Sequence, residues 1–125
     1  MADGFDEFKK SMNNMINSID DIVDKRFGAL LDEVVADTQL NTPVDTGNLK
    51  ASWDRSDIYK EGNVYEAEVG TDFDNAESVE FGHSTESGGF VKGQLMFTNA
   101  IKKAENKLQQ VGEEILNDII EESKL

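Results

Sequence analysis

Residues 42–53 have the sequence TPVDTGNLKASW, and the chain changes character on either side of them. The second residue of this stretch is the only proline among 125 residues, and proline interrupts a helix because its nitrogen carries no hydrogen. Asp45 or Thr46 can then act as the N-cap of a short helical turn. Leu49 and Trp53 are four residues apart, so they face the same side of that turn. We predict that a long helix ends here and that Leu49 and Trp53 anchor the corner between this helix and a sheet.

Upstream of this stretch, residues 1–41 carry apolar side chains at alternating steps of three and four, the spacing of a helical stripe. The stripe shifts by one residue near Gly28, which indicates a bend or a change of packing partner. A straight helix over residues 5–40 would be about 54 Å long. A compact chain of this size has a diameter of only about 36 Å, so the helix must either break or project toward a partner. The stripe consists of Phe5, Phe8, Met12, Met15, Ile19 and Ile22, followed by Val23, Phe27, Leu30, Val34 and Thr38.

Residues 93–125 show the same periodicity and predict a second long helix, about 45 Å in length. Two interpretations of the long helices stay open. They pack on each other and on a sheet within one subunit, or they extend into contacts with other copies. The stripe of the second helix consists of Phe97, Ile101, Ala104, Leu108, Val111, Ile115 and Ile119.

Between the helices, residues 42–92 contain most of the glycines and have the character of strands and turns. Residues 56–60 and 64–69 predict a β-hairpin around Gly62, with one apolar and one mainly acidic face. Residues 76–81 fit a strand or a helical turn, and residues 83–92 predict a flexible loop. We therefore expect one α+β domain over residues 1–125, a small antiparallel β-sheet flanked by two long helices.

The composition is acidic, with 26 acidic and 12 basic residues, a net charge of −14 and a hydrophobic fraction of 38%. Such a charge excludes electrostatic binding to DNA, RNA or an anionic membrane, because all three would repel it. No segment approaches the roughly 20 apolar residues of a membrane span, and residues 1–6 lack the basic and apolar regions of a secretion signal. We expect a cytosolic protein that does not use a membrane.

The chemistry-bearing residues do not form a recognisable site. Residues 72–83 begin like a calcium loop, but Ala76 and Glu77 replace a ligand and the glycine, and His83 replaces the final glutamate. His83 has Ser84 and Glu86 nearby, yet a catalytic triad needs an acid from elsewhere and an oxyanion hole. No phosphate-binding loop is present, and there is no cysteine. We predict no catalytic residue, no cofactor and no metal, and therefore not an enzyme.

Residues 42–53, the sequence VEFGH at 79–83 and the sequence GQLMF at 93–97 together carry a resemblance. In this order they resemble the neck proteins of long-tailed double-stranded-DNA bacteriophages, variously called tail-completion, head–tail joining or minor capsid proteins. The similarity extends over about residues 38–108. The combination of TPVDTGNL with VEFGH makes the resemblance specific.

The resemblance implies a virion protein of the neck, assembled in the bacterial host cytoplasm as a homo-oligomeric ring of six copies. Such a ring lies between the head connector or adaptor and the tail-tube protein, and double-stranded DNA passes through it without specific binding. An acidic wall suits this passage, because repulsion keeps the duplex from adhering. The candidate interface residues are Phe5, Phe8, Asp45, Thr46, Gly47, Leu49, Trp53, Glu80, Phe81, Gly82, His83, Phe90 and Val91.

Two other functions are compatible with the composition. An acidic inhibitor or DNA mimic would occupy the groove of a host DNA-processing enzyme, although its carboxylates would have to follow a regular spiral. A small hydrolase would use His83, and unaltered function after His83→Ala would exclude it.

Overall fold

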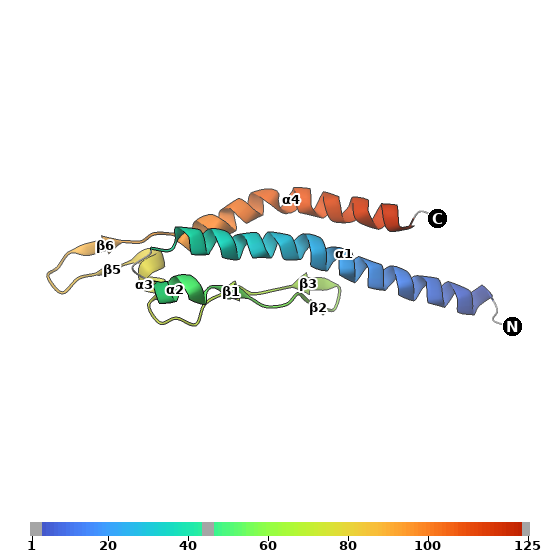
Figure 1. The fold of residues 1–125 in the computed structure, drawn as a ribbon, viewed down its shortest axis with the longest axis horizontal. Coiled ribbons are helices and arrows are strands. Elements are labelled where there is room, and N and C mark those ends of the chain that lie inside the picture. The colour runs from blue at the N-terminus through green and yellow to red at the C-terminus, as the bar shows by residue number, and fades with distance from the viewer. Residues whose placement is uncertain (1–3, 44–46, 124–125) are drawn as a thin grey trace.

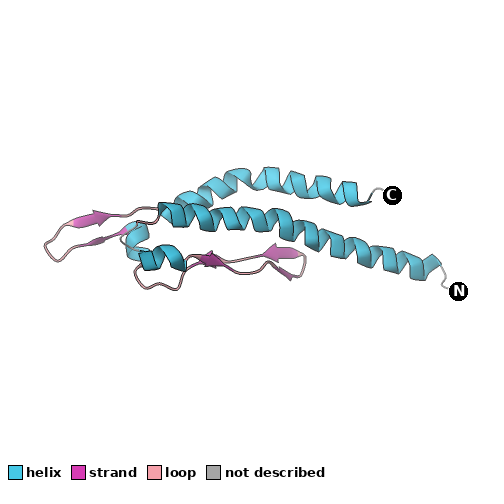
Figure 2. Ribbon diagram, viewed as in Figure 1, coloured by secondary structure: helices cyan, strands magenta, loops and turns pink. Residues whose placement is uncertain are grey.

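The computed structural model describes residues 4–43 and 47–123 and shows an elongated α+β chain (Figure 1). The long axis is helix α1 (Gly4–Asn41), and helix α4 (Met96–Ser123) lies antiparallel beside it. The strands β1 to β4 lie along the opposite flank of α1 (Figure 2). Both termini are at one end of the molecule, and a β-hairpin projects from the other end (Figure 1). The predicted fold class is therefore confirmed.

Helix α1 is continuous over 38 residues, which corresponds to a length of about 57 Å. It projects rather than breaks, and its N-terminal part extends beyond the end of α4 (Figure 1). The helix does not break at Gly28, and the strand region contacts α1 on both sides of this residue, at Asp20 and at Asp32. A Cβ atom at Gly28 would lie at ordinary contact distances, 3.5 Å from Nη2 of Arg55 and 3.9 Å from Cδ1 of Ile58, so Gly28 faces these two residues.

The predicted hairpin on this flank is present as two short antiparallel ladders along one ribbon. Strand β2 (Tyr59–Glu61) pairs with β3 (Val64–Glu66), and β1 (Asp54–Arg55) pairs with β4 (Val69–Gly70). Gly62 has a φ of 61° at the turn, a conformation that glycine adopts without a steric cost. The predicted alternation is also found. Tyr65, Ala67 and Val69 are half-buried, whereas Val64, Glu66 and Glu68 are exposed.

Residues 76–92 differ from the sequence-based expectation. The segment that could be a strand or a turn is a short helix, α3 (Ala76–Phe81). The predicted loop 83–92 is largely a hairpin, in which β5 (Gly82–Ser84) pairs with β6 (Phe90–Lys92). Its turn is closed by a hydrogen bond of 2.9 Å from the Thr85 amide to the Gly89 carbonyl. Backbone pairing therefore occurs where the serine- and glycine-rich composition predicted an open loop.

The second long helix begins at Met96 rather than at residue 93. Before it starts, the chain runs back along α3, because the amides of Gln94 and Leu95 donate to the carbonyls of Val79 and Glu80 at 2.8 and 3.0 Å. These contacts tie the start of α4 to α3.

A small apolar core lies where α2 and the start of α4 meet. Leu49, on helix α2 (Gly47–Ser52), packs with Trp53 and Met96, and the Trp53 ring stacks on Phe97 with 5.3 Å between ring centroids. The accessible surface is 9032 Å², whereas a compact monomer of 13.9 kDa exposes about 6,700 Å². The chain therefore exposes far more surface than a self-contained domain of its mass.

Candidate assembly surfaces

The residues that carry the sequence motif VEFGH hold the start of α4 in place. Glu80 is 3% exposed, and its carboxylate accepts hydrogen bonds from the amides of Phe97 and Thr98 at 2.9 and 2.7 Å. The hydroxyl of Thr98 also donates to it at 2.5 Å. Leu95, which precedes the helix, has a φ of 50° and carries no polar side-chain atom. Glu80 therefore satisfies helix amides that would otherwise lack a partner.

Two glycines allow the chain to cross itself at the base of the β5–β6 hairpin. A Cβ atom at Gly82 would lie 2.3 Å from the carbonyl oxygen of Val91, and one at Gly93 would lie 2.3 Å from that of Glu80. Gly82 also has a φ of 88°. The crossing fixes the direction in which the hairpin leaves the body.

The TPVDTGNLKASW stretch forms the corner that the sequence predicts, as far as it is described. The indole nitrogen of Trp53 donates to Oγ1 of Thr42 at 3.1 Å, and Thr42 in turn donates to the carbonyl of Thr38 at 2.7 Å. Leu49 and Trp53 are 0% and 6% exposed. They belong to the core of the molecule and provide no free surface in this conformation.

Four other predicted interface residues lie in or near this corner, and the described ones are not all exposed. Asp45 and Thr46 lie outside the described residues, and Gly47 is exposed at the start of α2. Glu80 is buried as the helix cap, so it too provides no free surface.

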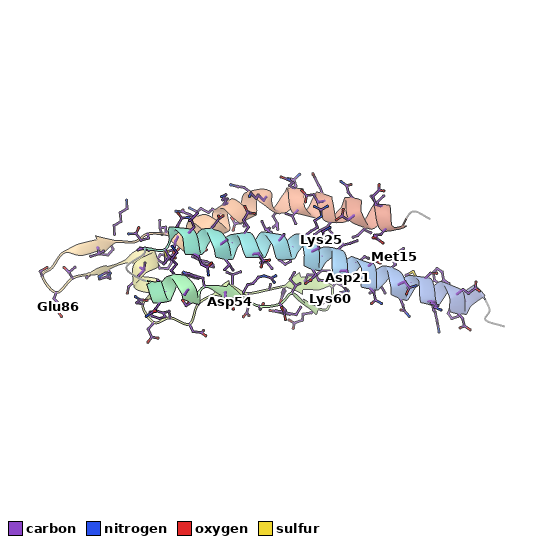
Figure 3. The ribbon with its side chains drawn as sticks, viewed as in Figure 1. Met15, Asp21, Lys25, Asp54, Lys60 and Glu86 are labelled. Carbon is purple, nitrogen blue, oxygen red and sulfur yellow. The ribbon has the colours of Figure 1, made fainter. Side chains whose placement is uncertain are left out.

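The β5–β6 hairpin presents apolar side chains at one end of the molecule. Phe81 at its base and Phe90 on β6 are 61% and 66% exposed, and Val91 is 45% exposed. His83 is also exposed and pairs with Val91 across the ladder. Glu86 marks the tip in Figure 3, far from Met15 near the other end. We define the hairpin surface as Phe81, Phe90 and Val91, of which Phe90 and Val91 lie on opposite faces of the two-stranded hairpin because they are consecutive in β6.

The opposite end of the molecule carries a second apolar surface on the projecting part of α1. Phe5 and Phe8 are 63% and 60% exposed, and Met12, Met15 and Ile16 are also exposed. We call these five residues, which lie between positions 5 and 16, the N-terminal stripe.

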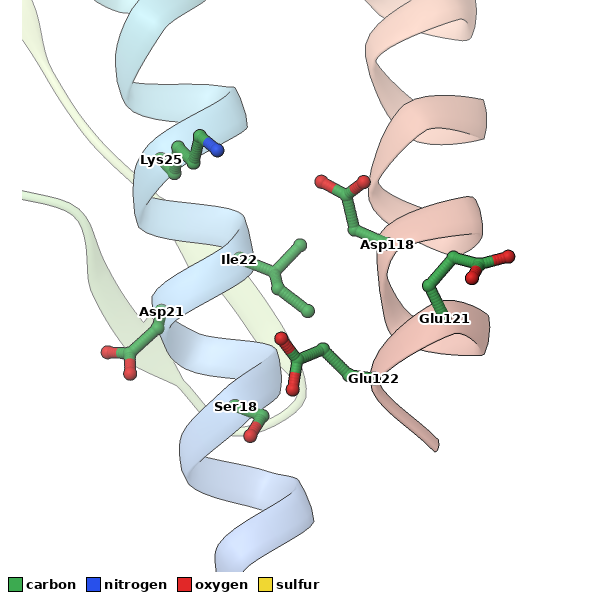
Figure 4. A pocket seen from close by; sticks show the side chains of 7 residues that line it. All are labelled: Ser18, Asp21, Ile22, Lys25, Asp118, Glu121 and Glu122. Carbon is green, nitrogen blue, oxygen red and sulfur yellow. The ribbon is translucent and has the colours of Figure 1, made fainter. Parts of the chain in front are cut away.

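The stripe continues into an open groove between α1 and the end of α4. A cavity of about 270 Å³ is lined there mainly by Met15, Ile19 and Ile22 of α1 and by Ile119 and Glu122 of α4. A neighbouring cavity of about 570 Å³ is more polar (Figure 4). In Figure 4, Ile22 and Glu122 point into the space between the helices, whereas Asp21 points away from α4.

Ion pairs join α1 to α4 next to this groove and further toward the C-terminal end of α1. Arg26 donates to Asp118 at 2.7 Å and to Glu114 at 2.9 Å, and Lys107 donates to Glu33. The hydrogen bond from Arg26 lowers the pKa of Asp118, and that from Lys107 lowers the pKa of Glu33. Both pairs are partly solvated, so they orient the helices more than they stabilise them.

The β-ribbon is fastened to α1 by Tyr65. Its hydroxyl donates to Asp20, and Lys60 lies 4.0 Å from the same carboxylate. Burial, together with the hydrogen bond to Asp20, raises the pKa of Tyr65 to about 12. Arg55 on β1 adds an ion pair to Asp32 at 2.6 Å.

Sequence reasoning did not identify Arg26 or Tyr65, because their partners lie 92 and 45 residues away. Only the position of Tyr65 on the apolar face of its strand pointed to a packing role.

The residues that the sequence offered for metal binding or catalysis are not brought together in the part of the chain that the structure describes. Within residues 4–43 and 47–123, there is no group of three potential metal ligands. His83 makes no hydrogen bond to Ser84 or Glu86 there. None of the described helices is long and apolar enough to cross a lipid bilayer.

The structure thus describes a paired-helix α+β chain with an apolar surface at each end. The comparison with protein families assigns it more narrowly. Residues 6–82 match the family described as "Bacteriophage HK97-gp10, putative tail-component", and the chain belongs to this family. The matched region begins within the first turn of α1, includes α2, the β-ribbon and α3, and ends at Gly82, the first residue of β5. No curated protein and no solved structure gave a match.

Proposed function

We propose that the chain is a structural subunit of the phage neck, without a catalytic role. Copies form a ring, of six subunits by the resemblance, that completes the tail and joins it to the head connector. Membership of a family of phage tail components supports a role in the virion. The observation that carries the proposal is the exposed apolar surface. Phenylalanines are exposed at both ends of a chain whose core is small.

The hairpin surface is the contact that we assign to a neighbouring ring or subunit. Phe90 and Val91 project from the body on a short hairpin whose direction is set by the glycine crossing. Exposed aromatic side chains of this kind are typical anchors of protein interfaces, because they bury a large area at a small entropic cost.

The acidic charge fits a ring around a DNA channel. A net charge of −14 opposes adhesion of the duplex, so DNA can slide past the wall during packaging and ejection. The ring would surround DNA without binding it specifically.

The test is deletion of the gene from the phage that encodes it, followed by electron microscopy of the lysate. We expect separate filled heads and tails, and joined virions after complementation with the wild-type gene. Mass spectrometry of purified virions should detect the protein. Joined, infectious particles without the protein would overturn the proposal.

An acidic inhibitor of a host DNA-processing enzyme remains the second candidate, supported by the charge alone. The acidic side chains are spread over α1, the β-ribbon, residues 72–86 and α4, and Arg26 already pairs with two of those on α4. A pull-down that retrieves a DNA-binding enzyme, and loses it when duplex DNA is added, would favour this candidate.

A further inference from the structure

The N-terminal stripe and the adjoining groove are complementary to each other. From Phe5 to Ile22 the apolar residues follow steps of three and four, the a and d positions of two and a half heptads. The first half of this pattern belongs to the N-terminal stripe, which lies on the projecting part of α1 and is exposed. The second half, with Ile19 and Ile22, lines the groove beside α4.

We propose that the free protein is a two-fold symmetric dimer in which the N-terminal stripe of each copy occupies the groove of the other. With the two α1 helices antiparallel, the pattern is self-complementary. Phe5 lies level with Ile22 of the second copy, Phe8 with Ile19, and Met12 with Met15. Both phenylalanines thus reach the groove, and the pairs of α1 and α4 helices form a four-helix bundle.

The charges around the stripe are mixed in this register, so the apolar pattern is what sets it. The ammonium of Lys9 lies 4.8 Å from the ring centroid of Phe5, beside the stripe. In the dimer Lys9 falls level with Ser18 of the second copy, which lines the groove together with Glu122. Asp6 falls level with Asp21 and Glu7 with Asp20, so like charges also meet beside the apolar positions.

The exposed area is sufficient for such an interface. The chain exposes roughly 2,300 Å² more than a compact monomer of its mass, and a standard interface removes about 800 Å² from each partner. The dimer would account for about a third of the excess, and the hairpin surface would stay free at the other end. The dimer therefore does not depend on the proposed ring, and a two-fold contact does not itself close a ring.

The first test is the mass of the purified full-length protein by light scattering at several concentrations. We expect twice the chain mass of 13.9 kDa. Phe8→Ala should raise the dimer dissociation constant roughly tenfold or more, as loss of an interface anchor does. Leu40→Ala is the matched control, because Leu40 is 73% exposed on the same helix but far from the stripe, and it should leave the mass unchanged.

The second test measures the register and uses the absence of cysteine from the chain. Phe8→Cys and Ile19→Cys proteins, mixed and oxidised, should form a disulfide-linked heterodimer in preference to either homodimer. Circular dichroism of each variant checks that the helices persist. A strictly monomeric wild type, a ring-sized mass, or cross-linking of each variant only with itself would overturn the proposal.

Discussion

At the scale of single residues, Glu80 shows how a motif that resembles an interface can serve the fold. Its carboxylate is buried and accepts three hydrogen bonds from the first turn of α4. We expect Glu80→Ala to lower the free energy of unfolding by about 2–3 kcal/mol, because two helix amides lose their partner. Glu80→Gln should fall between this variant and wild type, since it keeps one acceptor oxygen.

Urea denaturation followed by circular dichroism measures this effect. Glu77→Ala is the control, since Glu77 is exposed on the same short helix and should change the stability by less than about 0.5 kcal/mol. Equal stability of the Glu80 and Glu77 alanine variants would show that Glu80 does not cap α4.

Gly82 provides a second prediction at this scale, with a control in the same hairpin. Gly82 and Gly88 both have a φ of 88°, but a Cβ atom would clash with Val91 only at Gly82 and would meet open space at Gly88. Gly88→Ala should cost about 1 kcal/mol from backbone strain alone. Gly82→Ala should cost about 3 kcal/mol, because strain and overlap add. Equal losses in urea denaturation would argue against the crossing.

At the scale of elements, Tyr65 couples the β-ribbon to α1 in a pH-dependent way. Its pKa is about 12 in the folded protein, against 10.0 for the unperturbed side chain. The folded state therefore retains the phenolic proton more strongly than the unfolded state. The stabilisation is complete below pH 10 and is lost as the pH rises from 10 through 12.

The expected result is a steeper alkaline loss of stability in wild type than in Tyr65→Phe, measured by urea denaturation between pH 8 and 11.5. Tyr59→Phe is the comparison variant on the neighbouring strand, and because desolvation and nearby Glu66 also raise the pKa of Tyr59, it removes only the contribution of Tyr59 itself. It should retain the alkaline loss that Tyr65 causes. Parallel pH profiles for wild type and Tyr65→Phe would contradict the coupling.

At the scale of the whole molecule, the repeating patterns were predictable and the single long-range contacts were not. The stripes of α1 and α4 repeat over many turns, so they identify both helices and their excessive length. The β5–β6 hairpin has only three residues in each strand, which leaves no alternation to detect. Glu80 caps amides 17 and 18 residues away, and this distance is closed only by the folded chain. For the same reason the sequence predicted that Leu49 and Trp53 lie at a corner, but not that Met96 and Phe97 of α4 would bury them.

The separation of the two apolar ends leads to a prediction about assembly. Phe90→Ala with Val91→Ala removes exposed side chains at the tip of the molecule, outside the core. The free energy of unfolding should therefore change by no more than about 0.5 kcal/mol for each substitution. Complementation of the deleted phage should nevertheless fall by at least tenfold, because the contact with the neighbouring protein loses its aromatic anchor.

Phe73→Ala is a matched control, since Phe73 is exposed in the segment between β4 and α3 and should complement normally. Full complementation by the double variant would show that the hairpin is not an assembly contact. An unstable double variant would show that the hairpin supports the fold.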